Sequence, residues 1–204
     1  MRPIFWTGAA DHISKYFVHN VRLQRICDVY PLYIVYSGAS DYLKQYYPKA
    51  NLIACTNDWM EKAIAVHAVI RSRSDYDFVV RFCPDTVIKD VDWLLRSIVE
   101  GMEGADQTAV GNMAVFNGVT YLRGACNTTP KRVYTDLVLQ PNDRDYDTWY
   151  SMAVVAAGGQ MKDHPLFEIN HQYTGAFPVW HPTQYDMGHR DMDVRFKAFF
   201  SEMQ

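Results

Sequence analysis

Short, continuous apolar segments alternate with helix-like segments through the first half of the chain, and this alternation constrains the fold more than any other feature. Uninterrupted apolar segments of this length suit strands that are buried on both faces. Asp11 and Asp58 stand where the N-caps of the intervening helices are expected. Strands joined by helices predict βαβ units and a mostly parallel sheet with helices on its faces. The expected strands cover residues 3–8, 31–36, 51–55 and 77–82.

The second half of the chain is less regular. Residues 108–122 alternate apolar and polar side chains, which indicates antiparallel strands. A helix is expected from Asp147 to the glycines at 158 and 159, and the tail beyond it is rich in His, Tyr, Trp and Pro. No Pro/Gly/Ser-rich linker divides the 204 residues, of which 49% are hydrophobic. We therefore expect one α/β domain over residues 1–204, with a regular half at 1–105 and an irregular half at 106–204.

Charge and composition argue against several classes of partner. The net charge is -3 and no run of Lys and Arg exceeds two residues, whereas nucleic-acid-binding domains carry a strongly basic face. The longest uncharged apolar stretch, residues 149–159, is shorter than the about 20 residues that span a bilayer. The first residues hold no apolar segment long enough for a secretory signal, so we expect either a cytoplasmic protein or an excised domain. The four cysteines form no CxxC pair, which predicts free thiols.

The residues that follow each expected strand are the candidates for chemistry, because parallel sheets bind ligands beyond the carboxyl ends of their strands. The most informative segment is residues 78–88. An apolar strand ends there, Cys83 and Pro84 follow it, and Asp85 comes next, before an apolar pair. The other candidate segments are residues 7–8, 37–38 and 56–58.

Residues 78–88 resemble the acidic metal motif of GT-A class nucleotide-sugar glycosyltransferases, and the order of expected elements over residues 3–185 resembles that class as well. The resemblance implies a Rossmann-like fold with a nucleotide-binding half and an acceptor half. It also implies a metal-dependent hexosyl- or deoxyhexosyltransferase with a UDP-sugar donor and a glycan or glycoprotein acceptor. Mn²⁺ or Mg²⁺ would join the anionic leaving diphosphate to oxygen ligands of the protein.

The resemblance assigns the metal to Asp85, which matches the last Asp of the motif. The first Asp of the motif would fall on Cys83, whose thiol is a poor ligand for a hard cation. Cys83 and Pro84 then belong to the nucleotide-binding segment. The residues alone leave open that Asp85 only begins a turn. Asp90 and Asp92 form a literal DxD, but they precede an amphipathic segment and are predicted to cap its helix.

GT-A enzymes complete the metal site with a histidine from a late loop. His181 is the best match, because Pro178 and Pro182 make its segment rigid. A surface or core role for His181 stays open from the sequence. The other candidates are His164, His171 and His189.

Asp145 and Asp147 open the helix expected before Gly158. In inverting members of the class, an acidic pair in this position supplies the general base, which takes a proton from the acceptor hydroxyl. The resemblance therefore implies a catalytic role for this pair, with Asp147 at the matching spacing. An ordinary helix-capping role fits the same residues.

The resemblance also implies contacts to the nucleotide. Thr7 and Gly8 would hold the uracil at the end of the first strand. Lys62 or Arg71, on the helix before the metal strand, would meet the phosphates or the base edge, and solvated helix charge is the alternative. Residues 123–127 resemble an acceptor-side loop, in which glycine lets the backbone approach the sugar.

A weaker resemblance connects the chain with the N-terminal domain of the enzyme that glycosylates the chlorovirus major capsid protein. It implies capsid glycosylation in the host cytoplasm. Two other functions fit the residues: a metal-dependent nucleotidyltransferase or phosphohydrolase, and a non-catalytic carbohydrate-binding module in which Trp149 and Trp180 stack on sugars. Cys83, in place of the expected Asp, keeps both alternatives open.

Overall fold

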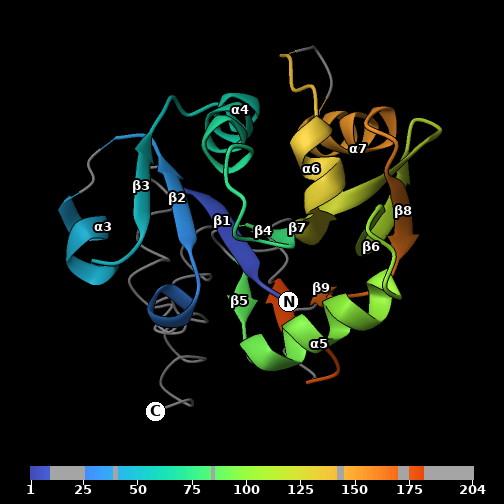
Figure 1. The fold of residues 1–204 in the computed structure, drawn as a ribbon, viewed down its shortest axis with the longest axis horizontal. Coiled ribbons are helices and arrows are strands. Elements are labelled where there is room, and N and C mark those ends of the chain that lie inside the picture. Colours follow the sequence, from blue (N-terminus) through green and yellow to red (C-terminus); the bar gives the residue numbers. More distant parts are fainter. Residues whose placement is uncertain (10–25, 39–40, 84–85, 142–144, 170–174, 182–204) are drawn as a thin grey trace.

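A seven-stranded sheet forms the centre of the part of the chain that the structure describes (Figure 1). The computed structural model describes residues 1–9, 26–38, 41–83, 86–141, 145–169 and 175–181. Across the sheet, the strands follow the order β3-β2-β1-β4-β7-β6-β8. Their bounds are β1 (Pro3–Ala9), β2 (Leu32–Tyr36), β3 (Asn51–Ala54), β4 (Phe78–Phe82), β6 (Thr108–Phe116), β7 (Val119–Pro130) and β8 (Gln160–Asp163).

The parallel half of the sheet confirms the prediction from the sequence. Strands β3, β2, β1 and β4 all run parallel, and β7 then pairs antiparallel with β4. The register places Trp6 of β1 beside Arg81 of β4, and Arg81 beside Asn127 of β7. These four strands are the apolar segments of the first half of the chain. The fold is therefore the Rossmann-like, mostly parallel α/β fold that the sequence predicts.

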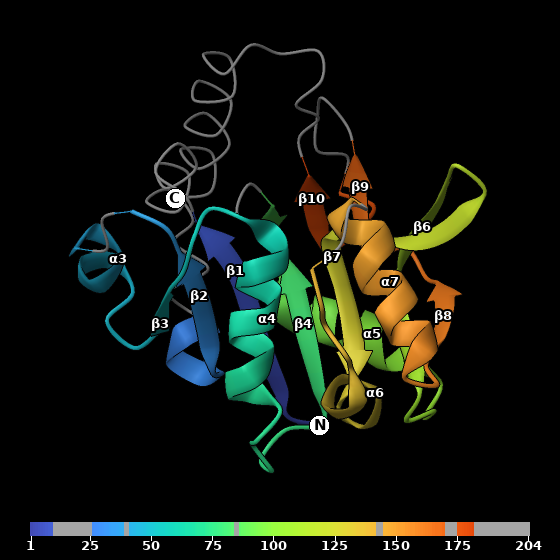
Figure 2. The same ribbon diagram turned by 90° about the horizontal axis from the view of Figure 1, so that it is seen from above.

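Helices cover both faces of the sheet (Figure 2). On one face, α4 (Trp59–Ile70), α6 (Lys131–Asp136) and α7 (Tyr146–Ala156) pack on apolar side chains such as Ile4 and Val79. On the other face, α5 (Val91–Met102) packs on Phe78 and Val80. A short helix, α3 (Asp41–Tyr46), follows β2. Alternate residues of each buried strand enter opposite cores, which is why apolar residues fill most positions of these strands.

A second, three-stranded sheet lies on the α5 side of the molecule. It consists of β5 (Val87–Ile88), β9 (Phe167–Ile169) and β10 (Val179–His181), with β10 in the middle. Strand β10 runs antiparallel to β5 and parallel to β9. Ile88, Phe167 and Val179 share one core with the apolar residues of α5. This small sheet brings the chain segment after β4 next to the segment around His181.

Aspartate side chains cap the N-termini of α4, α5 and α7. Asp58 accepts from the Glu61 N–H at 2.9 Å, and Asp90 accepts from the Trp93 N–H at 2.8 Å. Asp145 accepts from the N–H of Thr148 at 3.1 Å and so caps α7. The predicted capping role of Asp90 is confirmed. A carboxylate in this position satisfies a helical N–H group that would otherwise lack a partner.

Strands β6 and β7 form the predicted antiparallel pair, with one large irregularity. Gly111 lies opposite Asn127 and Met113 opposite Leu122, so a single residue of β6 faces residues 123–126 of β7. The prediction of a loop at residues 123–127 is therefore wrong, because this segment is part of β7. Between these two pairs β7 bulges away from β6, with four residues opposite one.

Two smaller expectations from the sequence can also be compared with the structure. All four cysteines are free thiols, as predicted. Among the helices of the described residues, none has the length and apolar character needed to cross a bilayer.

Candidate functional site

Polar residues that follow the parallel strands meet at one edge of the sheet. The Ser37 hydroxyl, after β2, donates to Asn57 Oδ1, after β3, at 3.3 Å. The same oxygen accepts from Lys62 Nζ at 3.2 Å. The first residue of α4, Trp59, lies 6.2 Å from the ring of Tyr146, the first residue of α7. The carboxyl ends of the strands and the N-termini of two helices thus form a common edge, as the fold requires of a ligand site.

An ion pair between Arg81 and Asp147 lies at the centre of this edge. Arg81 Nη1 donates to Asp147 Oδ1 at 2.9 Å, and the Gly124 N–H donates to Asp147 Oδ2 at 2.8 Å. The Arg81 side chain is 5% exposed and the Asp147 side chain is 28% exposed. The guanidinium is therefore enclosed by protein, while the Asp147 side chain is partly exposed.

Gly124 makes this arrangement possible. A Cβ at this position would lie 2.3 Å from Asp147 Oδ1 and 2.5 Å from Arg81 Nη1. Only a residue without a side chain leaves room for both charged groups. The bulge of β7 brings the Gly124 backbone close to α7, so the N–H group meets the carboxylate.

Aromatic rings surround the guanidinium of Arg81. Its Cζ lies 4.1 Å from the ring centroid of Tyr146 and 5.9 Å from those of both Trp6 and Trp59. Burial opposes the charged form, but Tyr146, Asp147 and Cys83 together raise the pKa of Arg81 above its ordinary value. Burial also raises the pKa of the Tyr146 hydroxyl. At neutral pH this cluster therefore holds a charged Arg81 and a neutral Tyr146.

Lys62 is a second buried cation near the same edge. Its side chain has no exposed surface, and Nζ lies 5.2 Å from the centroid of the Trp59 ring. Burial lowers the pKa of Lys62, while Cys55 and Asp58 act in the opposite direction. Lys62 thus lies with the strand-end residues and is not the solvated helix charge that the sequence left open, while its contact with a phosphate stays a prediction.

The end of β1 is less open than the sequence analysis assumed. Thr7 is fully buried, and its hydroxyl donates to the Gly8 carbonyl at 3.4 Å. Gly8 lies under Trp59, because a Cβ there would be 2.4 Å from Cζ3 of the indole. A ligand that approaches Gly8 from the α4 side meets Trp59 first.

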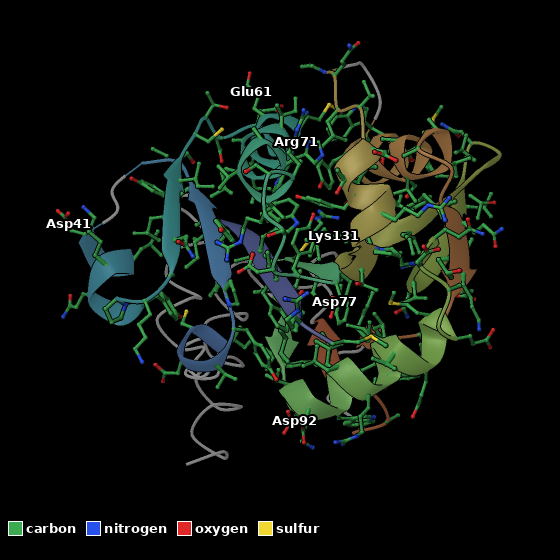
Figure 3. The ribbon with its side chains drawn as sticks, viewed as in Figure 1. Asp41, Glu61, Arg71, Asp77, Asp92 and Lys131 are labelled. Atoms are coloured by element: carbon green, nitrogen blue, oxygen red, sulfur yellow. The ribbon has the colours of Figure 1, made fainter. Side chains whose placement is uncertain are left out.

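Arg71 and Asp145 do not join the central ion pair. Arg71 is the C-cap of α4, whereas Glu61 lies in the first turn of this helix; both are labelled in Figure 3. The helix has 12 residues, which corresponds to about 18 Å between its ends. The carboxylate of Asp145 accepts from the N-terminus of its own helix.

The expected metal site involves residues beyond those described. Pro84 and Asp85 lie outside the described residues, and so do His171 and His189. Among the residues that the structure describes, no three His, Cys, Asp or Glu side chains gather into a metal-binding group. The Cys83 thiol is directed at a backbone oxygen, the Gly124 carbonyl, at 3.2 Å.

The backbone around His181 is described, although its side chain is not. In the small sheet, Trp180 pairs with Val87 and Val179 with Ile88. Because β5 and β10 run antiparallel, His181, the residue after Trp180, lies at the same end of this strand pair as Thr86, the residue before Val87. Thr86 directly follows Asp85 in the sequence. His164, another candidate from the sequence, lies elsewhere, against Gly101 of α5.

A groove of about 670 Å³ lies at the opposite edge of the sheet, where β1 and β4 begin. Asp77 and Lys131, both labelled in Figure 3, are among the residues that line it. Most of its charged side chains already have partners: Arg2 pairs with Asp77 at 3.3 Å, Arg132 pairs with Asp106 at 3.2 Å, and Lys131 donates to a backbone carbonyl at 2.9 Å. The groove therefore offers little free charge for a ligand.

Sequence reasoning missed Arg81 and Trp59. A signal for Arg81 was present, because a single arginine interrupts an otherwise apolar strand of residues 78–82. Charged residues are almost never fully buried without a partner, so this arginine predicts a buried acid opposite it. The position of Trp59 over Gly8 depends on how α4 packs, which no local pattern indicates.

Comparison with solved structures identifies the class of fold. The galactosyltransferase LgtC, solved with donor and acceptor sugar analogs, is similar over 98% of this chain and 96% of its own chain, at 11% identity and a TM-score of 0.54. A nucleotidyl transferase from Methanothermobacter thermautotrophicus is similar over 98% of this chain and 99% of that one, at 9% identity and a TM-score of 0.56. The chain has the α/β fold that GT-A glycosyltransferases and nucleotidyltransferases share.

A mannosyltransferase from Pyrobaculum calidifontis, solved with GDP-Man and Mn²⁺, is similar over 81% of this chain, at 16% identity and a TM-score of 0.55. This chain spans 55% of the length of that enzyme. The sequence matches no protein-family profile and no curated protein. These comparisons confirm the expected fold, and they lend no support to the resemblance to the chlorovirus enzyme.

Proposed function

We propose that this protein is a glycosyltransferase that moves a sugar from a nucleotide sugar to a hydroxyl of a glycan or glycoprotein. The observation that carries the proposal is Asp147, whose carboxylate is held at the carboxyl edge of the sheet in a side chain that is partly exposed. The fold supports it, because nucleotide-sugar enzymes are among the solved structures that share this architecture.

Asp147 acts as the general base in this proposal. A carboxylate has about four lone-pair sites, and Arg81 and the Gly124 N–H use two of them. The remaining sites are free to accept the proton of an acceptor hydroxyl. The acceptor oxygen then forms a bond to the anomeric carbon while the bond to the nucleoside diphosphate breaks, and the diphosphate leaves with the electron pair. A single displacement of this kind inverts the anomeric configuration.

The first half of the chain, residues 1–105, binds the donor in this proposal, and residues 106–204 bind the acceptor. We propose a UDP-sugar as donor and Mn²⁺ or Mg²⁺ as the cation, with Asp85 and His181 as protein ligands. The cation would neutralise the leaving diphosphate when bound. The pairing of β5 with β10 supports this pair of ligands. Cys83 and Pro84 would border the nucleotide. Lys62, Thr7 and Gly8 are buried, so they would support this edge of the sheet rather than contact the ligand.

The carboxylate of Asp147 favours glycosyl transfer over nucleotidyl transfer, which enzymes of the same fold also catalyse. In nucleotidyl transfer to a sugar phosphate, the attacking phosphate oxygen is already ionised at neutral pH, since a phosphate monoester has its second pKa at about 6. Such a nucleophile needs no base, and a nearby carboxylate would repel it. A neutral hydroxyl needs the base that Asp147 supplies.

Ligand-induced stabilisation tests donor and metal binding. Melting temperatures are measured for the wild type, Asp85→Asn and Asp92→Asn with UDP, with Mn²⁺ and with both. Asp92 is the matched control, because it is an exposed carboxylate in the first turn of α5. Saturation at 100 times the dissociation constant adds about 2.7 kcal/mol, or roughly 5–11 °C for a domain of this size. We expect this shift only with both ligands, and only Asp85→Asn should lose it.

Turnover tests the chemistry. Release of nucleoside diphosphate is followed with UDP-glucose, UDP-galactose and GDP-mannose, with water or a simple glycoside as acceptor. Asp147→Asn should lower kcat by about 10²–10⁴-fold and leave UDP binding unchanged. Asp145→Asn, which keeps the helix cap, is the control and should stay active. Formation of pyrophosphate from a nucleoside triphosphate and a sugar phosphate would instead establish the nucleotidyltransferase alternative. Glycan binding that needs neither metal nor nucleotide would establish a binding module.

A further inference from the structure

Arg81 is a charged side chain that no part of the proposed reaction uses directly. Its side chain is 5% exposed, and aromatic rings of Trp6, Trp59 and Tyr146 lie around it. An enclosed guanidinium cannot contact a donor or an acceptor that binds at the surface of the site. Arg81 can therefore affect bound substrates only indirectly, through its ion pair with Asp147.

We infer that Arg81 is a positioning residue for the general base, an inference that rests on the proposed function of Asp147. Arg81 fixes Oδ1 at 2.9 Å, and the Gly124 N–H fixes Oδ2 at 2.8 Å. With both oxygens held, the carboxylate cannot rotate about its terminal torsion. Its free lone pairs then keep one direction, toward the side on which the acceptor hydroxyl must lie.

Arg81 is itself held from both halves of the chain. Strand β4 provides its backbone, and β1 and α4 provide the two indole rings. The second half provides Tyr146, the closest ring at 4.1 Å, and Asp147. The guanidinium thus connects the strands of the proposed donor half to the helix that bears the base. A displacement of Arg81 would change the position of Asp147 relative to the donor.

The planar shape of arginine matters for this role. A guanidinium can lie on an aromatic ring and donate in its plane at the same time, whereas an ammonium group is a point charge without that geometry. Lysine at this position would keep the charge and lose the fixed direction of the donor. Methionine would keep the length and lose both. These two substitutions therefore separate the geometric contribution from the electrostatic one.

The test compares kcat and KM for nucleotide-sugar turnover in the wild type, Arg81→Lys and Arg81→Met. The substrate is whichever of UDP-glucose, UDP-galactose and GDP-mannose the wild type consumes fastest. We expect kcat to fall by about 100-fold in Arg81→Met and about 10-fold in Arg81→Lys, because small displacements of reacting groups cost this much. KM should stay within about twofold, because Arg81 does not contact the donor.

A second pair of variants leaves both ionic groups in place. Tyr146→Leu removes the ring that supports the guanidinium, and Tyr146→Phe keeps it. The Tyr146 hydroxyl is buried without a hydrogen-bond partner among the described residues, so its loss alone should change little. We expect a lower kcat only in Tyr146→Leu. This comparison decides the matter if Arg81→Met fails to fold.

The outcomes separate this inference from the proposed function. Full kcat in folded Arg81→Met, or equal kcat in Tyr146→Leu and Tyr146→Phe, would overturn the positioning role while Asp147→Asn stays inactive. A raised KM with unchanged kcat would also overturn it, because Arg81 would then bind the donor. Activity retained in Asp147→Asn would show that Asp147 is not the general base, and the proposed function of this residue would fail. No turnover of any donor by the wild type would overturn both proposals.

Discussion

Replacing Gly124 with alanine would place a methyl group between the two charged side chains of the site. The new Cβ would lie 2.3 Å from Asp147 Oδ1 and 2.5 Å from Arg81 Nη1. Real contacts of this kind are longer than 3 Å, so the ion pair must open. The backbone of Gly124 cannot retreat easily, because the next residue, Ala125, accepts from the Cys83 N–H at 3.0 Å and β7 pairs with β4 from Cys126 onward.

The expected cost has two parts. Crowding of a well-packed interior by one methyl group destabilises a protein by about 1–3 kcal/mol, which corresponds to roughly 2–12 °C in melting temperature for a chain of this size. Displacement of Asp147 by about 1 Å would lower kcat by about 100-fold. The loss of activity should therefore be much larger than the loss of folded protein can explain.

The assay measures urea unfolding and nucleotide-sugar turnover on the same preparations. Gly159→Ala is the matched control, because its Cβ would lie 2.8 Å from the side chains of Val133 and Val154, away from the ion pair. We expect both variants to lose stability and only Gly124→Ala to lose kcat. Equal kcat in Gly124→Ala and Gly159→Ala would refute the reasoning, since it would mean that the position of Asp147 does not matter.

Three further predictions concern stability. Burial lowers the pKa of Lys62 in the folded state below 10.5, so the unfolded state holds this proton more tightly than the folded state does. As pH rises toward 10.5, chemical denaturation should therefore show the wild type gaining stability relative to Lys62→Met. Cys126 behaves in the opposite way. Burial raises its pKa from 9.0 to about 12, so the wild type should lose stability as pH rises from 9 toward 12, and more steeply than Cys126→Ala. Asp145→Ala removes the cap of α7 and should cost about 0.5–2 kcal/mol in urea unfolding, whereas Asp145→Asn should cost little. Equal slopes with pH, or equal stability of the two Asp145 variants, would contradict these accounts.

The sequence by itself determined the parallel half of the fold and the edge at which to look for chemistry. Apolar segments with intervening helix patterns leave few alternatives, because a strand without polar residues must be covered on both faces. The capping role of Asp90 followed from its place before an amphipathic segment. The likeness of residues 78–88 to a metal motif stays a prediction, since Asp85 lies outside the described residues.

Only the tertiary structure decided which side chains act together. Arg81 and Asp147 are 66 residues apart, and Gly124 comes from a third element, so no local pattern connects them. The sequence left Asp145 and Asp147 equally suited to capping or catalysis. The structure separates them: Asp145 bonds to its own helix, and Asp147 bonds to Arg81 and to the backbone of β7. The physical reason is that strand and helix patterns are set by neighbouring residues, whereas a site is set by how α7 and the β7 bulge pack onto β4.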